Sequence, residues 1–209
     1  MIYELYKQLS SVYGKQNWWP LSGHMDKFDE VSIGAILTQN TSWKNVEKAL
    51  KNLISANVLS LGDILNTDET TLKNLIKPAG FYNLKAVRLK EFANAVKNIK
   101  KDEINREFLL SIKGIGKETA DTILLYGLDK ITFVVDAYTK RLFYRIGIVD
   151  SEKIDYDELK SLIESSIPRN LEIYKEFHAL IVEHCKNICK KKPLCNKCFL
   201  QNQCYNKQN

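Results

Sequence analysis

Four of the five cysteines lie in a short C-terminal segment, where their spacing suits a metal centre. They form the pattern Cys-x5-Cys-x2-Cys-x5-Cys, and they are Cys189, Cys195, Cys198 and Cys204. Cysteine thiolates are ligands of both zinc and iron–sulfur clusters. A zinc ribbon usually contains two separate Cys-x-x-Cys pairs, whereas this segment contains one. The sequence therefore predicts a thiolate metal site, with zinc and an iron–sulfur cluster both open.

The expected compartment supports metal binding by these thiols. The N-terminal segment has no basic start followed by an apolar run, so no signal peptide is visible. No stretch reaches the ~18 apolar residues that a membrane span needs. We therefore expect a cytoplasmic protein without a membrane partner, in which thiols stay reduced and bind metals before they form disulfides. The fifth cysteine, Cys185, is expected to be a packing or spare thiol.

A Gly-x-Gly turn is the second candidate site. It spans Ile112-Lys113-Gly114-Ile115-Gly116-Lys117 and joins two helical patterns. Two glycines let the backbone approach a phosphate closely, and the following helix offers free N–H groups at its N-terminus. An ordinary turn between helices is the alternative. The apolar frame and the two flanking lysines favour a hairpin that binds a nucleic-acid backbone without reading its sequence.

Asp136 is the third candidate, twenty residues beyond Gly116 and directly after the run Phe133-Val134-Val135. In isolation, an aspartate here is most simply an N-cap for the helix that follows. A helix N-terminus also keeps a carboxylate ionised, so a cap can have a chemical role as well. Breaking an N-glycosidic bond generates positive charge on the sugar, and a fixed carboxylate can stabilise that charge and orient a water molecule.

Basic residues exceed acidic ones by 31 to 25, which gives a net charge of +6. The excess is uneven, because no acidic residue follows Glu183. The lysines beyond that point are Lys186, Lys190, Lys191, Lys192, Lys197 and Lys207. Such a segment suits contact with phosphates, although a solvated lysine face is an equally common explanation.

Helices must position these groups, because the apolar spacing is helical almost everywhere. The pattern predicts one helix around residues 2–13, a second around 43–53 and a third around 86–99. Only residues 131–135 look extended, and they are too isolated to form a sheet. The predicted class is all-α.

The Gly-Ile-Gly turn with Val-Val-Asp twenty residues later resembles the helix-hairpin-helix Gly/Pro-Asp DNA glycosylases of the endonuclease III superfamily. The resemblance implies that Asp136 is catalytic. It also implies a two-lobed endonuclease III-like fold, with a helical barrel lobe (21–130) that carries the hairpin and a second helical lobe (1–20 and 131–209). Bifunctional lyases of the family have a lysine two residues after the second hairpin glycine, where this chain has Glu118. Lys117 lies about 100° away around the helix, so no lyase activity is expected.

The cysteine pattern is similar to the C-terminal loop of endonuclease III, which holds a [4Fe–4S] cluster. The first gap is one residue shorter here than in the commonest form of that loop. The resemblance implies that the four cysteines of residues 189–204 bind a [4Fe–4S] cluster, with zinc as the alternative. The lysines inside the first gap would then belong to a basic loop that the metal fixes against DNA.

Four stretches resemble the 3-methyladenine DNA glycosylase branch, and the likeness runs from about residue 17 to residue 185. The stretches are 18–20, 35–41, 78–83 and 113–121. In that branch, aromatic residues line a pocket for the flipped base, and aromatic faces attract a cationic alkylated purine. The matching pocket residues are Trp18, Trp19, Pro20 and Trp43, with Glu118 beside them. Filling of the core is the alternative role for the tryptophans.

We therefore predict a monofunctional, monomeric glycosylase that hydrolyses the N-glycosidic bond of alkylated purines in duplex DNA. The alternatives are a bifunctional glycosylase/lyase for oxidised pyrimidines and a non-catalytic iron–sulfur DNA-binding protein. Gln39 matches the residue that fills the gap left by the flipped nucleotide, whereas His178 and His184 are expected to be structural. The predicted DNA contacts are Gln39, Ile112, Lys113, Gly114, Gly116, Lys117, Thr119, Lys190, Lys191 and Lys192.

Overall fold

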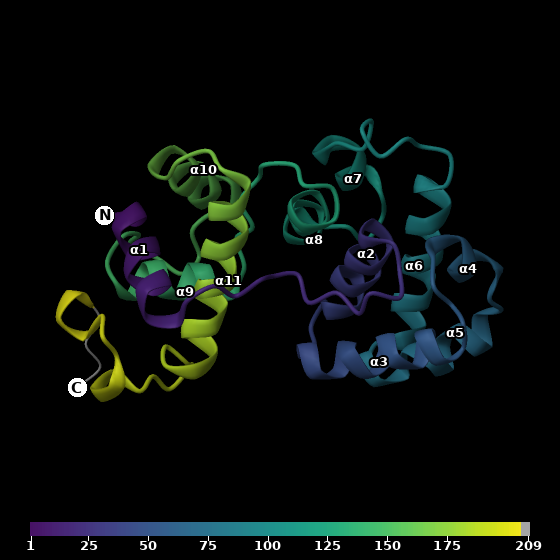
Figure 1. Ribbon diagram of the computed structural model, residues 1–209, viewed down its shortest axis with the longest axis horizontal. Helices are drawn as coiled ribbons and strands as arrows, with labels where there is room; N and C mark the ends of the chain where they lie inside the picture. Colours follow the sequence, from purple (N-terminus) through teal and green to yellow (C-terminus); the bar gives the residue numbers. More distant parts are fainter. Residues whose placement is uncertain (206–209) are drawn as a thin grey trace. The chain divides into compact units, whose positions relative to one another are not determined.

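Helices form all the regular secondary structure in the part of the chain that the structure describes, residues 1–205 (Figure 1). The structure is a computed structural model. The all-α prediction is confirmed, and the extended stretch predicted at 131–135 forms no strand. Lys207 lies outside the described residues.

The chain divides into two compact units. The terminal unit contains Met1–Trp18 and the described residues from Ile131 onward, and the internal unit contains Trp19–Lys130. The sequence placed this boundary at residue 20 or 21, and the structure places it between the two adjacent tryptophans.

The internal unit surrounds one almost completely buried helix, α2 (Lys27–Thr38). Helix α2 contacts α3, α6 and α8 and a π-helical turn, η2. The helices of this unit are α2, α3 (Trp43–Ser55), α4 (Leu61–Asn66), α5 (Glu69–Ile76), α6 (Tyr82–Val96), α7 (Arg106–Ser111) and α8 (Lys117–Thr122), with the short turns η1 (Lys77–Ala79) and η2 (Ile123–Gly127). The predicted helices around 43–53 and 86–99 correspond to α3 and α6.

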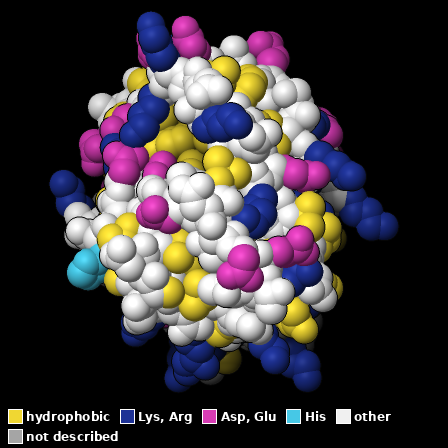
Figure 2. Space-filling view, turned by 90° about the vertical axis from the view of Figure 1, so that its right-hand side faces the viewer, with side chains coloured by type: hydrophobic (Ala, Val, Ile, Leu, Met, Phe, Trp, Pro, Cys, Tyr) yellow, Lys and Arg dark blue, Asp and Glu magenta, His cyan; other side chains and the backbone are white. Residues whose placement is uncertain are grey.

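The surface seen from the side of α4 and α5 carries charges of both signs. Figure 2 shows Lys and Arg side chains interspersed with Asp and Glu on this face. A mixed surface of this kind has no strong field of one sign with which to attract a polyanion.

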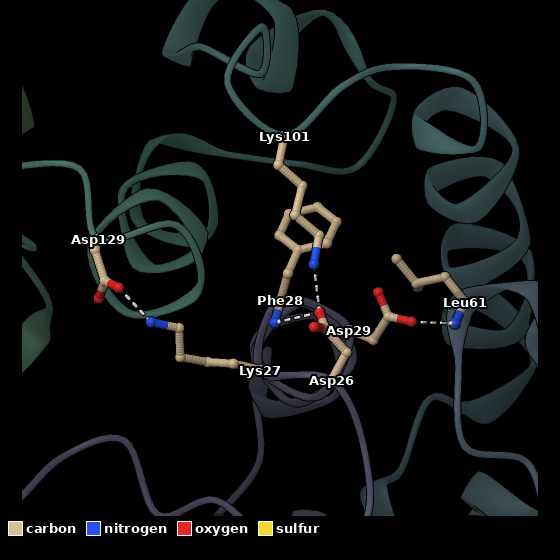
Figure 3. Close-up of polar contacts among 7 residues, drawn as sticks. All are labelled: Asp26, Lys27, Phe28, Asp29, Leu61, Lys101 and Asp129. Carbon is tan, nitrogen blue, oxygen red and sulfur yellow. Dashed lines mark hydrogen bonds and ion pairs between the residues drawn. The ribbon is translucent and has the colours of Figure 1, made fainter.

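Polar contacts hold the N-terminus of α2 in place (Figure 3). Asp26 caps the helix by accepting from the Phe28 N–H at 3.0 Å, and Lys101 Nζ donates to the same carboxylate oxygen at 2.7 Å. This lysine holds the pKa of Asp26 below its usual range. Asp29, in the first turn, accepts from the Leu61 N–H at 3.0 Å and so ties α4 to α2.

The terminal unit brings the two ends of the chain together. Helix α1 (Ile2–Tyr13) packs along α11 (Leu171–Asn187), and α9 (Ala137–Arg145) packs on α11 as well. Helix α10 (Tyr156–Ser166) contacts α1. Two short 3-10 turns follow α11, at Cys195–Lys197 and Gln201–Gln203. The predicted N-terminal helix corresponds to α1, whose residues Ile2, Leu5 and Leu9 are buried.

Candidate active site and nucleic-acid interface

Asp136 is the N-cap of α9. Its Oδ1 accepts hydrogen bonds from the Thr139 backbone N–H at 2.7 Å and from the Thr139 hydroxyl at 2.9 Å. Its Oδ2 lies 3.5 Å from Nε2 of His178 on α11, and only 12% of its side chain is exposed. Burial raises the pKa of Asp136, but the His178 and Thr139 contacts outweigh it and the pKa is lowered. The side chain is therefore a fixed, ionised carboxylate near neutral pH.

The environment of Asp136 extends to Trp18. The ring of Trp18 meets that of His178 edge to face, with centroids 5.6 Å apart. Glu176, two residues before His178, accepts from the backbone N–H groups of Gln16 at 2.7 Å and Asn17 at 2.9 Å. The carboxylate of Glu176 thus fixes the segment that leads into Trp18, and Lys186 Nζ lies 5.8 Å from the Trp18 ring centre.

The Gly-x-Gly turn links α7 to α8, as the hairpin prediction expected. Gly114 has a φ of +86°, and a Cβ there would lie 2.7 Å from Arg88 Nε. Glycine is required for both reasons. Gly116, the N-cap of α8, has no atom within 4 Å of an added Cβ, so its surroundings are open. Ile112 and Ile115 are buried and anchor the turn.

Gln39 lies directly after α2 and contacts the hairpin. Its Nε2 donates to the Gly114 carbonyl at 3.0 Å and to the Thr119 hydroxyl at 3.1 Å. Arg88 of α6 donates to its Oε1. The structure thus brings together three predicted DNA contacts, and it adds Arg88, which sequence reasoning missed. The other predicted hairpin contacts are Lys113, which is exposed, and Lys117, which is half-buried.

Two of the predicted pocket tryptophans lie together in the internal unit. The rings of Trp19 and Trp43 are 5.1 Å apart and perpendicular, and Tyr126 lies 5.4 Å from Trp19. A Cβ on Gly34 would lie 3.2 Å from the Trp19 ring, so the small residue admits that ring. Tyr126 was not predicted as a pocket residue; it follows the apolar run Ile123-Leu124-Leu125, a pattern typical of the core.

The remaining predicted pocket residues belong to different parts of the chain. Trp18 belongs to the terminal unit, beside His178. Pro20 is exposed, and Glu118 is exposed in the first turn of α8. Because Glu118 directly follows Lys117, the two side chains point about 100° apart on the helix.

The four cysteines of the predicted metal site lie in the segment of residues 189–204 that follows α11 and contains the two 3-10 turns, here called the cysteine loop. Burial raises the pKa of Cys198, a hydrogen bond with the Leu200 backbone opposes the rise, and the sulfurs of Cys189, Cys204 and Cys195 add to it. Cys204 Sγ donates to the Arg145 carbonyl at 3.1 Å. Within residues 1–205, no three His, Cys, Asp or Glu side chains are placed so as to hold a metal ion.

Two arginines of α9 attach the cysteine loop to the rest of the terminal unit. Arg145 donates to Cys189 Sγ at 3.4 Å and to the carbonyls of Lys190 at 2.6 Å and Lys191 at 3.1 Å. Arg141 donates to the Cys189 carbonyl at 2.9 Å. The side chains of Lys190, Lys191 and Lys192 are exposed. Sequence reasoning missed both arginines, since nothing local distinguishes them from other basic residues on α9.

Cys185 lies on α11, one turn before Cys189. It is buried, and its contact with Cys189 together with burial raises its pKa. The contact with Cys185 lowers the pKa of Cys189 to about 6, and Arg145 adds to the effect. These contacts agree with a packing position for Cys185.

Residues 33–169 match the model of the HhH-GPD superfamily of base excision DNA repair proteins. The chain belongs to this superfamily. The superfamily prediction is thereby confirmed, and the protein is a DNA glycosylase of base excision repair. The matched range includes the hairpin and Asp136.

Individual relatives agree with this assignment. The "Putative DNA repair glycosylase" of Methanocaldococcus jannaschii is 55% identical over 99% of this chain and 97% of that protein. The crystal structure of H. pylori 3-methyladenine DNA glycosylase bound to 1,N6-ethenoadenine is 36% identical, with a TM-score of 0.76 over 88% of this chain and 96% of that one. A non-covalent endonuclease III–DNA complex is 20% identical, with a TM-score of 0.84 over 98% and 94%. This last likeness confirms the endonuclease III-like fold.

Together these findings support DNA as the partner of this HhH-GPD glycosylase. No helix among the described residues is long and apolar enough to cross a membrane.

Proposed function

We propose that this HhH-GPD protein is a monofunctional glycosylase that hydrolyses the N-glycosidic bond of alkylated purines in duplex DNA. The observation that carries the proposal is Asp136, a nearly buried carboxylate kept ionised by Thr139 and His178. As the base leaves, the sugar becomes cationic, and a fixed negative charge stabilises that state without having to reorganise. The same carboxylate orients the water molecule that completes hydrolysis.

Two segments of the chain contact the DNA backbone in this proposal. The hairpin presents Lys113 and the open surroundings of Gly116 to a phosphate. The cysteine loop presents Lys190, Lys191 and Lys192, whose backbone Arg145 supports. Contacts of both kinds act on the DNA backbone and so leave the choice of base to the pocket.

The choice of an alkylated purine rests on aromatic residues. Trp19, Trp43 and Tyr126 form one aromatic group in the internal unit. Ring faces attract a cationic base, and a purine alkylated on a ring nitrogen is both cationic and a good leaving group. The relative from H. pylori is a 3-methyladenine DNA glycosylase and supports this choice.

The four cysteines suit a [4Fe–4S] cluster. Their spacing in the sequence supports the assignment, and Arg145 donates to the sulfur of Cys189. We assign Cys189, Cys195, Cys198 and Cys204 as its ligands. A bound cluster would supply a rigid, thiolate-held anchor for the loop, with a reduction potential that hydrogen bonds to the sulfurs tune.

One panel of oligonucleotides tests the proposal. Duplexes containing 3-methyladenine, hypoxanthine, uracil, thymine glycol or 8-oxoguanine are incubated with the protein and divided into samples with and without alkali. We expect fastest release of 3-methyladenine, strand breaks only after alkali, and no borohydride-trapped adduct. Breaks without alkali, together with trapping that Lys117→Ala abolishes, would establish a lyase. A neutral base as the best substrate would refute the alkylpurine assignment, and no release from any duplex would favour a non-catalytic DNA-binding protein.

A further inference from the structure

We propose that His178 is a positioning residue for the Asp136 carboxylate, an inference that rests on the proposed role of Asp136. Sequence reasoning expected His178 to be structural, because it lies on a helix forty-two residues from the aspartate. The structure instead places its Nε2 3.5 Å from Asp136 Oδ2.

The two oxygens of Asp136 have partners from different elements. Oδ1 is held from within α9, by both donors of Thr139. A carboxylate held at one oxygen can still turn, because the last side-chain torsion of aspartate is broad. The second contact, from α11, therefore determines the plane of the carboxylate. Contacts of this kind are often long in a free enzyme and shorten when substrate binds.

His178 is itself held in place. Only 6% of its side chain is exposed, and the edge of the Trp18 ring rests against its own. Glu176 binds the backbone just before Trp18, so α11 fixes both the histidine and the tryptophan that packs on it. A buried, packed ring can hold its partner in one orientation, as an exposed ring cannot.

Removal of the His178 donor should therefore weaken the charge that Asp136 presents to the sugar. If the 3.5 Å contact shortens to a hydrogen bond when substrate binds, its loss corresponds to roughly a tenfold to a hundredfold effect. A residue that only fills space would change the stability of the fold without changing the preference for a cationic sugar.

Three variants separate these roles. His178→Phe keeps a ring against Trp18 and removes both ring nitrogens. His178→Gln keeps a donor close to the position of Nε2, and His178→Asn has the same amide on a side chain one methylene too short. Tyr174→Phe is a matched control, since Tyr174 is buried on the same helix and packs on Phe133.

The readout is the ratio of two dissociation constants, measured with the whole chain as it is purified. One duplex contains a pyrrolidine abasic analogue, which is cationic, and the other contains a tetrahydrofuran analogue, which is neutral. Single-turnover excision of 3-methyladenine and thermal melting are measured in parallel.

We expect the unmodified protein and Tyr174→Phe to prefer the cationic analogue, and Asp136→Asn to lose that preference. His178→Phe should reduce it roughly tenfold to a hundredfold, and excision by a similar factor, while His178→Gln keeps most of both. If His178→Phe does not fold, His178→Asn should show the same loss of cationic preference and of excision relative to His178→Gln. A folded His178→Phe with an unchanged ratio would overturn the inference while leaving the role of Asp136 intact. No preference in the unmodified protein would overturn the proposed function, and this inference with it.

Discussion

At the scale of single residues, Asp136 combines two roles that the sequence left as alternatives. Its position as N-cap of α9 is established by the hydrogen bonds from Thr139. The same bonds, together with His178, lower its pKa, so a capping residue is also suited to chemistry. Its neighbours determine the charge of this carboxylate, and the residue type alone does not.

Asp136→Asn should abolish excision while DNA binding persists. The amide keeps the shape of the side chain and an acceptor for the Thr139 N–H, but it removes the negative charge that stabilises the sugar cation. Binding should tighten slightly, because a negative charge near phosphates is removed. Single-turnover excision and fluorescence-anisotropy binding measure the two effects. Near-normal excision would show that Asp136 acts only as a cap.

Trp19→Leu or Trp43→Leu should slow release of 3-methyladenine roughly tenfold to a hundredfold, and hypoxanthine less. Leucine keeps an apolar wall and removes the ring face that attracts a cation. Trp18→Leu is the contrasting variant, because Lys186 already lies over that ring; it should slow both bases equally. Equal slowing by all three variants would mean that the tryptophans shape the pocket without sensing charge.

At the scale of elements, Gly114 and Gly116 lie in the same turn but differ in the structural constraint on each position. Gly114 needs both its positive φ and the space that Arg88 occupies beside it. Gly116 has neither constraint, but its surroundings are open where a phosphate would approach. Gln39 donates to the Gly114 carbonyl, and Arg88 donates to Gln39 in turn, so the two side chains hold the turn at Gly114.

Gly114→Ala should lower the free energy of unfolding by about 1–2 kcal/mol, the typical cost of a left-handed conformation for a residue with a Cβ. Gly116→Ala should lower the free energy of unfolding less than Gly114→Ala does, because the added methyl group meets no neighbouring atom. It should weaken DNA binding more, because the methyl group occupies the open space that a DNA phosphate is proposed to enter. Thermal melting and binding to undamaged duplex distinguish the two. The expectation fails if both variants lose stability and affinity in the same proportion.

The cysteine loop is the second element with a testable role. Protein purified without oxygen should be yellow-brown and contain about four iron and four labile sulfide per chain if the cluster is the cubane. Cys198→Ala should bleach it, and Cys185→Ala, a buried thiol outside the proposed ligand set, should not. Iron, sulfide and zinc analyses measure this. Stoichiometric zinc without sulfide would contradict the cluster assignment.

At the scale of the whole molecule, the chain builds one unit from its two ends and another from its middle. Basic and acidic side chains are interspersed on the face in Figure 2, whereas the lysines after Glu183 have no acidic residue near them in the sequence. DNA affinity should therefore depend on specific lysines more than on the net charge of +6.

Replacing Lys190, Lys191 and Lys192 together with alanine should weaken binding to all duplexes by a similar factor. Each phosphate contact that is lost should reduce the slope of log affinity against log salt by about 0.9. A salt titration of binding, with cluster content checked in parallel, measures the change. An unchanged slope in protein that keeps its cluster would show that these lysines are only solvated.

The sequence by itself determined the local structure and the chemical inventory. Apolar spacing predicted α1, α3 and α6, because helical periodicity is set by residues within a few turns of one another. Glycine spacing located the hairpin, and cysteine spacing located the predicted metal site. Only the tertiary structure placed His178 beside Asp136, Arg88 against Gly114 and Arg145 on the Cys189 loop. Periodicity shows which face of a helix is buried, but the packing of all the helices together decides which faces meet.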